Sequence, residues 1–160
     1  MAKTIMSEEI LLRPAEEADS NDVFLWRNDK ASRGASFDTK EISWAEHQRW
    51  FSGSLLNSNR RVYIIMLKDG SKIGVLRFDI EAGSSVVSIN ISPKFRGLNY
   101  GKSALKKGCE VYFRENPSVQ YLVAKVKPGN TASLKAFENA GFKRHGVGLD
   151  HIELILRGAE

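Results

Sequence analysis

The sequence predicts an α/β domain in which about four helices flank a mixed, mostly antiparallel sheet of about seven strands. Two observations support this prediction. Residues 61–68, 72–80 and 85–91 are three consecutive segments with strand-like apolar patterns, and only short turns separate them. After them, helical and strand-like segments alternate to the end of the chain. The 160 residues have the length of one domain, so we expect a single domain over residues 1–160.

The N-terminal part of the chain is expected to begin with a short strand at residues 9–14. A helix follows at residues 18–27, where Asp19 and Ser20 are candidates for its N-terminal cap. Residues 30–42 show little periodicity, and we interpret them as a functional loop between this helix and the next.

The second helix is expected to begin at Ser43. Ser43 and Glu46 have the spacing of a capping box, in which the serine oxygen accepts from a backbone N–H and the glutamate reaches back to the cap. Along this helix, His47 and Trp50 lie on one face. The strand that follows, residues 61–68, is apolar on both faces and is therefore expected near the centre of the sheet.

The C-terminal half is expected to alternate between helices and strands. We predict a helix at residues 101–114, a strand at 121–126 and a last helix at 132–140. Residues 142–156 are expected to form two further strands.

The composition is typical of a soluble globular protein, with 42% hydrophobic and 27% charged residues. The single cysteine, Cys109, cannot form an internal disulfide, and it lies at an apolar helical position, so we interpret it as a core residue. No apolar run approaches 18 residues, and residues 1–8 lack the hydrophobic core of a signal peptide. We therefore expect a cytoplasmic protein without a membrane partner.

The charge balance is basic, with 24 Lys and Arg against 19 Asp and Glu and a pI of about 9.4. This excess suits an anionic ligand such as a coenzyme or a nucleotide sugar. The chain has no continuous basic run and no interleaving of basic and aromatic residues, so no nucleic-acid partner is expected. No cluster of His, Cys and Asp has the spacing of a ligand set, so no metal is expected.

The loop that joins the third strand to the next helix has the residues of an anion-binding site. Gly97 and Gly101 allow a close approach, Asn99 tolerates a left-handed conformation, and Arg96 and Lys102 add positive charge. The positive end of the following helix dipole points at the same spot, which suits a diphosphate. Alternatively, the glycines only shape a tight connection. The spacing fits neither G-x-G-x-x-G nor G-x-x-x-x-G-K-S/T.

Two motifs in this order resemble the GNAT superfamily of acyl-coenzyme A N-acyltransferases. Arg96, Asn99 and Gly101 occupy the places of R/Q-x-x-G-x-G/A, with asparagine where the family prefers glycine. Residues 130–142 are similar to N-x-x-S/A-x-x-x-Y/F-E-x-x-G-F. The resemblance covers roughly residues 11–156. It implies the GNAT fold and an acetyl-coenzyme A-dependent N-acetyltransferase, in which a primary amine attacks the thioester directly.

The resemblance also implies which residues hold the coenzyme. Those residues are Asn90, Ile91, Arg96, Gly97, Leu98, Asn99, Tyr100, Gly101, Lys102, Ser103, Asn130, Ser133 and Phe137. The backbone of Asn90 and Ile91 would supply the donors for the oxyanion.

The general base expected of this family, a glutamate on the strand before the loop, is missing here. Asp79, Glu81 and His47 are the remaining candidates. We favour His47, because imidazole titrates near neutrality and this helix is expected to border the acceptor cleft. A packing histidine on an amphipathic helix is the alternative interpretation.

The general acid expected of the family, a tyrosine in the last helix, falls at Phe137, which cannot donate a proton. Either the thiolate leaves without a dedicated acid, or Ser133 or Tyr100 serves through water. The candidate catalytic residues are therefore His47, Asp79 and Ser133.

The N-terminal half carries the evidence on the acceptor. Residues 26–29, 42–51 and 74–79 resemble the amino-sugar N-acetyltransferases of bacterial surface-polysaccharide and nonulosonate (pseudaminic-type) pathways, which act on 4-amino nucleotide sugars. By that resemblance the acceptor would contact Arg27, Asn28, Arg33, His47, Trp50 and Arg77. Two alternatives are a protein N-terminal acetyltransferase of the ribosomal-protein type and a non-catalytic module that binds coenzyme A or a nucleotide. A homodimer is a candidate assembly.

Overall fold

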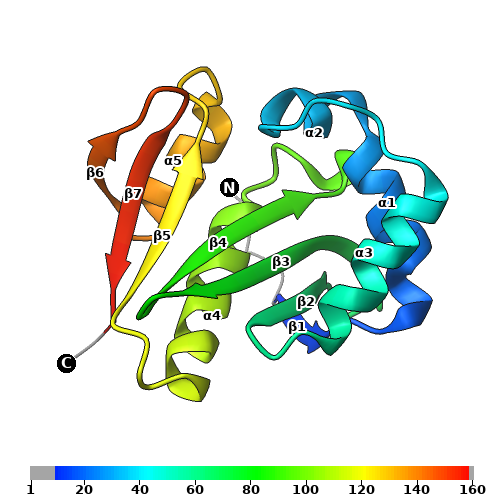
Figure 1. The fold of residues 1–160 in the computed structure, drawn as a ribbon, viewed down its shortest axis with the longest axis horizontal. Helices are drawn as coiled ribbons and strands as arrows, with labels where there is room; N and C mark the ends of the chain where they lie inside the picture. Colours follow the sequence, from blue (N-terminus) through cyan, green and yellow to red (C-terminus); the bar gives the residue numbers. More distant parts are fainter. Residues whose placement is uncertain (1–9, 159–160) are drawn as a thin grey trace, which may run out of the picture.

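The computed structural model describes residues 10–158. Residues 1–9 and 159–160 lie outside the described residues, and so does the N-terminal segment, residues 1–8, in which no signal peptide was expected. One seven-stranded sheet in the order β1-β2-β3-β4-β5-β7-β6 forms its centre (Figure 1). The strands are β1 (Leu11–Pro14), β2 (Arg60–Met66), β3 (Lys72–Glu81), β4 (Ser84–Ile91), β5 (Tyr121–Val126), β6 (Lys143–Val147) and β7 (Ile152–Arg157). The helices are η1 (Glu17–Asp19), α1 (Ser20–Asn28), α2 (Lys30–Ala35), α3 (Trp44–Leu56), η2 (Pro93–Phe95), α4 (Tyr100–Glu115) and α5 (Thr131–Asn139), η1 and η2 being 3₁₀ helices.

Every neighbouring pair of strands in the sheet is antiparallel except β4 and β5. The two tight turns of the hairpin series adopt positive φ at Gly70 (90°) and Gly83 (86°), which glycine allows without a steric penalty. The predicted mixed, mostly antiparallel sheet of seven strands is thus confirmed.

The parallel pair is also where the sheet opens. β4 and β5 pair over three residues only, Ser84, Ser85 and Val86 of β4, and then diverge (Figure 1). The remaining part of β4, residues 87–91, has no described strand beside it on that edge. This divergence positions the candidate site.

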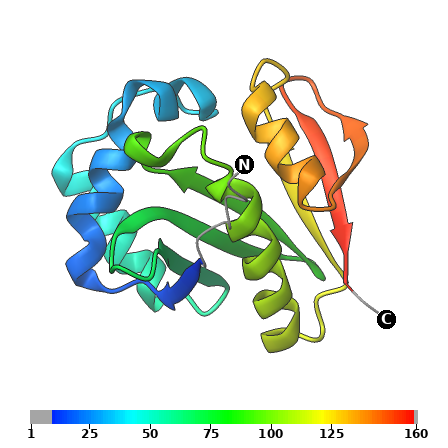
Figure 2. The ribbon, with the colours of Figure 1, turned by 180° about the vertical axis from the view of Figure 1, so that it is seen from behind.

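Helices cover both faces of the sheet. α4 and α5 pack on one face (Figure 2). The larger core lies there and contains the stacked rings of Phe78 and Tyr112, with centroids 4.1 Å apart. α1 and α3 cover the other face of β2 and β3, where Trp26, Phe51 and Ile64 are buried together. Because side chains of β2 alternate between these two cores, its apolar residues are buried on both faces, as predicted for a central strand.

Several predicted elements are confirmed closely. β5 has the predicted bounds, and α4 and α5 begin and end within one residue of the predicted helices. Ser43 caps α3, since its Oγ accepts from the N–H of Glu46 at 3.2 Å. Cys109 lies in the core with 2% exposure, and burial raises the pKa of its thiol to about 12.

The prediction of a loop across residues 30–42 is wrong for its first part, which is helix α2. Asp29 caps this helix by accepting from the N–H of Ser32 at 3.2 Å. Six residues with small and polar side chains carry no amphipathic pattern, and so short a helix depends on its cap and on tertiary contacts rather than on propensity.

Asp19 precedes α1, as predicted, but its side chain makes no cap hydrogen bond. Its buried carboxylate instead accepts from Arg13 and Lys72, both at 2.8 Å. Burial alone would raise the pKa of Asp19, but these hydrogen bonds outweigh burial and hold the pKa well below its usual range. Asp19 therefore ties β1 and β3 to the start of α1.

Across residues 10–158, none of the helices combines the length and the hydropathy that a bilayer-spanning segment needs.

Candidate functional site

A cavity of about 610 Å³ lies where β4 and β5 diverge. Its wall combines β4 and β5 with the start of α5 on one side and with residues of α1, α2, α3 and β3 on the other. Of the residues predicted from the sequence, the cavity brings together eight: Arg27, His47, Trp50, Arg77, Asn90, Asn130, Ser133 and Phe137. Its volume lies in the range that binds small molecules and cofactors.

The backbone of β4 faces this cavity with one open edge. The N–H of Ser92, directly after β4, donates to the carbonyl of Ile73 beside β3 at 2.7 Å. Successive N–H groups of an extended chain alternate between its two edges, so the N–H of Ile91 points to the edge that β5 has left. Of the two predicted oxyanion donors, alternation favours Ile91 over Asn90.

The predicted anion loop continues from this edge into α4. Asn99 adopts the left-handed conformation expected for it (φ 65°, ψ 13°), and Gly97 has φ 78°. Asn99 is the N-cap residue of α4, and its side chain accepts no hydrogen bond from the backbone N–H groups of the first turn. A Cβ at Gly101 would lie 3.9 Å from Ile91 and from Ala136 of α5. The start of α4 therefore packs against β4 and α5, and the N–H groups of its first turn are the donors that a diphosphate of the coenzyme would need.

Arg96, the first residue of the loop motif, is engaged by the protein itself. Its Nη1 donates to Asp29 at 2.8 Å, its Nη2 to the hydroxyl of Ser32 at 2.6 Å, and its Nε to the carbonyl of Ile91 at 2.9 Å. The guanidinium thus connects the loop after β4 to the start of α2. A phosphate contact is consequently expected from the loop backbone and Lys102 rather than from this side chain.

The start of α5 completes the coenzyme side of the cavity. Asn130 caps α5 by accepting from the N–H of Ser133 at 3.2 Å. Ser133 is half-buried in the cavity wall, whereas Phe137 is 3% exposed and packs edge-to-face on Phe142. Ser133 is thus the hydroxyl that this helix offers to the cavity.

His47 is fully buried in the cavity wall among the aromatic rings of Phe24, Trp44, Trp50 and Phe51. Its Nε2 lies 2.9 Å from the carbonyl of Ser20, which can only accept, so Nε2 carries the proton. Its Nδ1 is buried without a partner in the described residues. Burial lowers the pKa of His47 and so favours the neutral imidazole, in which the lone pair of Nδ1 has no hydrogen-bond donor among the described residues.

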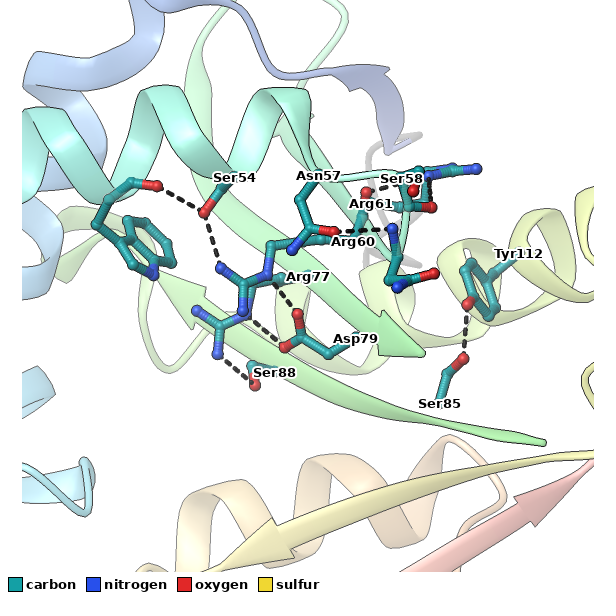
Figure 3. A network of polar contacts seen from close by, with 12 residues as sticks. Ser54, Asn57, Ser58, Arg60, Arg61, Arg77, Asp79, Ser85, Ser88 and Tyr112 are labelled. Atoms are coloured by element: carbon teal, nitrogen blue, oxygen red, sulfur yellow. Dashed lines mark hydrogen bonds and ion pairs between the residues drawn. The ribbon is translucent and has the colours of Figure 1, made fainter. Parts of the chain in front are cut away.

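Asp79, the second base candidate, does not line the cavity. Its carboxylate is shared between Arg60 and Arg77, and Arg77 also donates to the hydroxyl of Ser88 at 3.4 Å (Figure 3). Both oxygens of this carboxylate are engaged by guanidinium groups, and the residue lies outside the cavity wall, so Asp79 is not placed to take a proton from an acceptor in the cavity. In this arrangement Asp79 orients Arg77, whose guanidinium carbon lies 5.3 Å from the ring centroid of Trp50.

Asn28 and Arg33, predicted to contact the acceptor, instead contact the protein: Asn28 holds the loop after α2, and Arg33 connects α2 to the end of α1. Asn28 pairs with the backbone of Ile42 in both directions, donating at 2.8 Å and accepting at 2.9 Å. Arg33 donates to the carbonyl of Asn28 at 3.1 Å. Neither lines the cavity.

Sequence reasoning did not identify several residues of the cavity wall, among them Ser32, Phe37, Asp38, Ser88 and Lys125. Ser88 could have been found, since the β3–β4 register pairs it with Arg77. The others depend on how α2 and β5 are placed, which no local pattern reveals. In residues 10–158, no group of three or more His, Cys, Asp or Glu side chains is arranged to hold a metal ion.

Comparison with known proteins identifies the family of the chain. The sequence model of the acetyltransferase (GNAT) domain matches residues 9–143. The putative phosphinothricin acetyltransferase YwnH of Bacillus subtilis (strain 168) is 28% identical over 143 residues, which is 85% of each chain.

Two solved structures show the same fold. AAC(6')-Ib in complex with paromomycin and acetyl-CoA has a TM-score of 0.84 at 19% identity and 94% coverage of both chains. Spermidine N-acetyltransferase from Vibrio cholerae, in complex with CoA and spermine, has a TM-score of 0.84 at 15% identity, with 92% of this chain and 95% of the other covered. The names of these three proteins state three different acceptors.

Proposed function

The chain belongs to the acetyltransferase (GNAT) family and is an acetyl-coenzyme A-dependent N-acetyltransferase, and from this premise we propose that its acceptor is the primary amine of a nucleotide-linked amino sugar. The observation that carries the proposal is the continuous cavity, which joins the open edge of β4 to an aromatic and arginine-bearing wall. Trp50 gives this wall an aromatic side chain that would border a sugar or a base, and Arg27 and Arg77 would supply cations for phosphate.

The coenzyme, when bound, supplies an acyl group activated as a thioester. The loop of residues 96–103 and the first turn of α4 would hold its diphosphate, and Asn130 and Ser133 would border its other end. The N–H of Ile91, at the open edge of β4, would stabilise the charge that develops on the carbonyl oxygen. These positions are consistent with the resemblance of the two motifs.

The acceptor amine must be neutral before it can attack. We assign its proton to Nδ1 of His47, since that nitrogen has no partner and its ring is held by Ser20 through the other nitrogen. Ser133 is the hydroxyl near the opposite side of the cavity and would pass a proton to the departing thiolate through water. A coenzyme thiol has a pKa near roughly 8.5, so this last demand is mild.

A peptide acceptor, the other enzymatic possibility, is less well matched to this wall. The two carboxylates of the wall, Asp38 and Glu46, are exposed, whereas Arg27 and Arg77 are half-buried. Buried cations select an acceptor that carries negative charge.

The proposal is tested by steady-state release of coenzyme A thiol from acetyl-coenzyme A with three acceptors: a UDP-linked 4-amino sugar, spermidine and a peptide with a free N-terminus. We expect the UDP-linked amino sugar to give the highest kcat/KM. A higher kcat/KM for the peptide or for spermidine would overturn the assignment of the acceptor.

A further inference from the structure

The side chain of Arg77 lies in a cluster that has more positive than negative charge. Arg77 and Arg60 share the single carboxylate of Asp79, and both guanidinium carbons lie over the ring of Trp50, at 5.3 Å and 5.6 Å from its centroid (Figure 3). Arg60 is further held by the hydroxyl of Ser54 at 2.8 Å. Two cations against one anion leave this cluster with an excess of one positive charge, and Arg77 is its member in the wall of the cavity.

Arg27, on α1, adds a further cation to the wall of the cavity. Its Nη2 donates to the carbonyl of Asp38 at 3.2 Å. Its Nη1 is buried and has no partner in the described residues, although it can donate two hydrogen bonds. A buried donor without an acceptor costs free energy, so this guanidinium, which lines the cavity, is not neutralised by the described residues.

The two arginines are close enough to influence each other. Burial lowers the pKa of Arg77, and the positive charges of Arg60 and Arg27 lower it further, although Asp79 opposes them. The carboxylates of the wall, Asp38 and Glu46, are exposed and therefore screened by water. The half-buried part of the wall thus lacks an anion that could balance Arg27.

We propose that Arg27 and Arg77, assisted by Ser88, form a subsite for an anionic oxygen group of the acceptor, a phosphate or a carboxylate, beside the ring face of Trp50. This inference rests on the proposed function, because the subsite is part of the proposed binding site for the acceptor. It adds a rule of selectivity: the enzyme favours amines that carry negative charge and disfavours polycationic amines, which would place further positive charge beside two arginines.

The subsite is tested by isothermal titration calorimetry of the full chain with four ligands: glucosamine, glucosamine 1-phosphate, muramic acid and UDP. We expect at least one anionic amino sugar, and UDP, to bind roughly 10- to 100-fold more tightly than glucosamine, as charge-assisted hydrogen bonds imply. Tighter binding of glucosamine 1-phosphate assigns the subsite to phosphate, and tighter binding of muramic acid assigns it to carboxylate. Equal affinity for the three sugars would overturn the inference.

Variants locate the binding. Arg27→Met and Arg77→Met should each weaken UDP binding by roughly tenfold or more, whereas Arg61→Met, which removes an exposed arginine of the neighbouring strand, should leave it unchanged. Arg77→Lys keeps the charge and should retain part of the affinity. Thermal unfolding verifies that each variant is folded. Loss of UDP binding in Lys102→Met, with binding intact in Arg27→Met and Arg77→Met, would place the phosphate at the anion loop and contradict the subsite.

The same measurements separate the inference from the proposed function. If UDP binds through Arg27 and Arg77 but no amine is acetylated, the subsite stands and the assigned acceptor fails. If amines are acetylated with no preference for anionic ones, and both Met variants behave as the native chain, transfer stands and the subsite fails.

Discussion

Arg96 and Asp29 lie 67 residues apart in the sequence, and Nη1 of Arg96 donates to Oδ2 of Asp29 at 2.8 Å. The pair connects the loop after β4 to the cap of α2. The ion pair therefore joins the loop proposed to bind the coenzyme to the helix α2 beside the proposed acceptor site. Arg96 also donates to the hydroxyl of Ser32, so the start of α2 is held at two points.

Replacing Arg96 should loosen α2. We expect Arg96→Met to lower the free energy of unfolding by about 1 to 2 kcal/mol, because the charge-assisted bond to the half-buried Asp29 is lost. Hydrogen exchange should become faster at the amides of residues 30–35. Lys102→Met is the control: it should weaken coenzyme binding and leave exchange in α2 unchanged. Unchanged exchange in the Arg96 variant would show that α2 is held by other contacts.

Replacing Gly101 tests the coenzyme loop. A Cβ there makes only ordinary contacts at 3.9 Å, so Gly101→Ala should fold and bind acetyl-coenzyme A as the native chain does. Gly101→Phe should fold but raise the dissociation constant for acetyl-coenzyme A by roughly 10- to 100-fold, since a bulky side chain keeps phosphate from the backbone donors. Calorimetry gives both constants. Unchanged affinity in a folded Phe variant would remove the coenzyme from this loop.

His47 should make the stability of the protein sensitive to mild acid. Its pKa is lowered by burial in the folded state, so below its ordinary value of about 6.5 the unfolded chain binds more protons than the folded one. Stability contributed by the neutral ring is therefore complete above that pH and declines as the pH falls through it.

The measurement is the midpoint of urea unfolding between pH 7.5 and 5. His47→Gln should show a smaller decline than the native chain, whereas His145→Gln, at an exposed position, should show the same decline as the native chain. The His47 variant should also lose roughly 100-fold or more in kcat with the amine acceptor. Full activity in His47→Gln would assign the base elsewhere.

Asp19 should be worth far more to stability than its neighbour Asp22. Asp19→Ala leaves the cations of Arg13 and Lys72 without their buried carboxylate, and we expect a loss of about 3 kcal/mol in the free energy of unfolding. The side chain of Asp22 is 42% exposed and lies 3.2 Å from Lys72, so we expect Asp22→Ala to lower the free energy of unfolding by less than about 1 kcal/mol. Similar losses for the two variants would contradict the role of Asp19.

Local chemistry made much of the fold predictable. The left-handed conformation of Asn99, the cap at Ser43 and the bounds of β5 each follow from residues within one turn or one strand. The order of strand, glycine loop and helix was likewise readable from consecutive residues, whereas the binding of an anion at this loop stays a prediction.

The parts that escaped prediction depend on distant partners. α2 has no apolar periodicity and is held by Arg96, far along the chain. Arg96 was expected to bind a ligand and Asp79 to accept a proton, but Arg96 is paired with Asp29 of another element, and Asp79 is paired with Arg60 of β2 as well as with Arg77 of its own strand. The depth of His47 in its aromatic surroundings likewise follows from how α1 and α3 pack, which residue spacing on one helix does not determine.

The central claim is that this acetyltransferase modifies an amine on a molecule that also carries phosphate. The most direct measurement is incubation with acetyl-coenzyme A and an equimolar mixture of a UDP-linked 4-amino sugar, spermidine and a peptide with a free N-terminus, followed by mass spectrometry of all three. We expect the nucleotide sugar to gain one acetyl group first, and Arg77→Met to abolish this preference. Acetylation of spermidine or of the peptide ahead of the nucleotide sugar would contradict it.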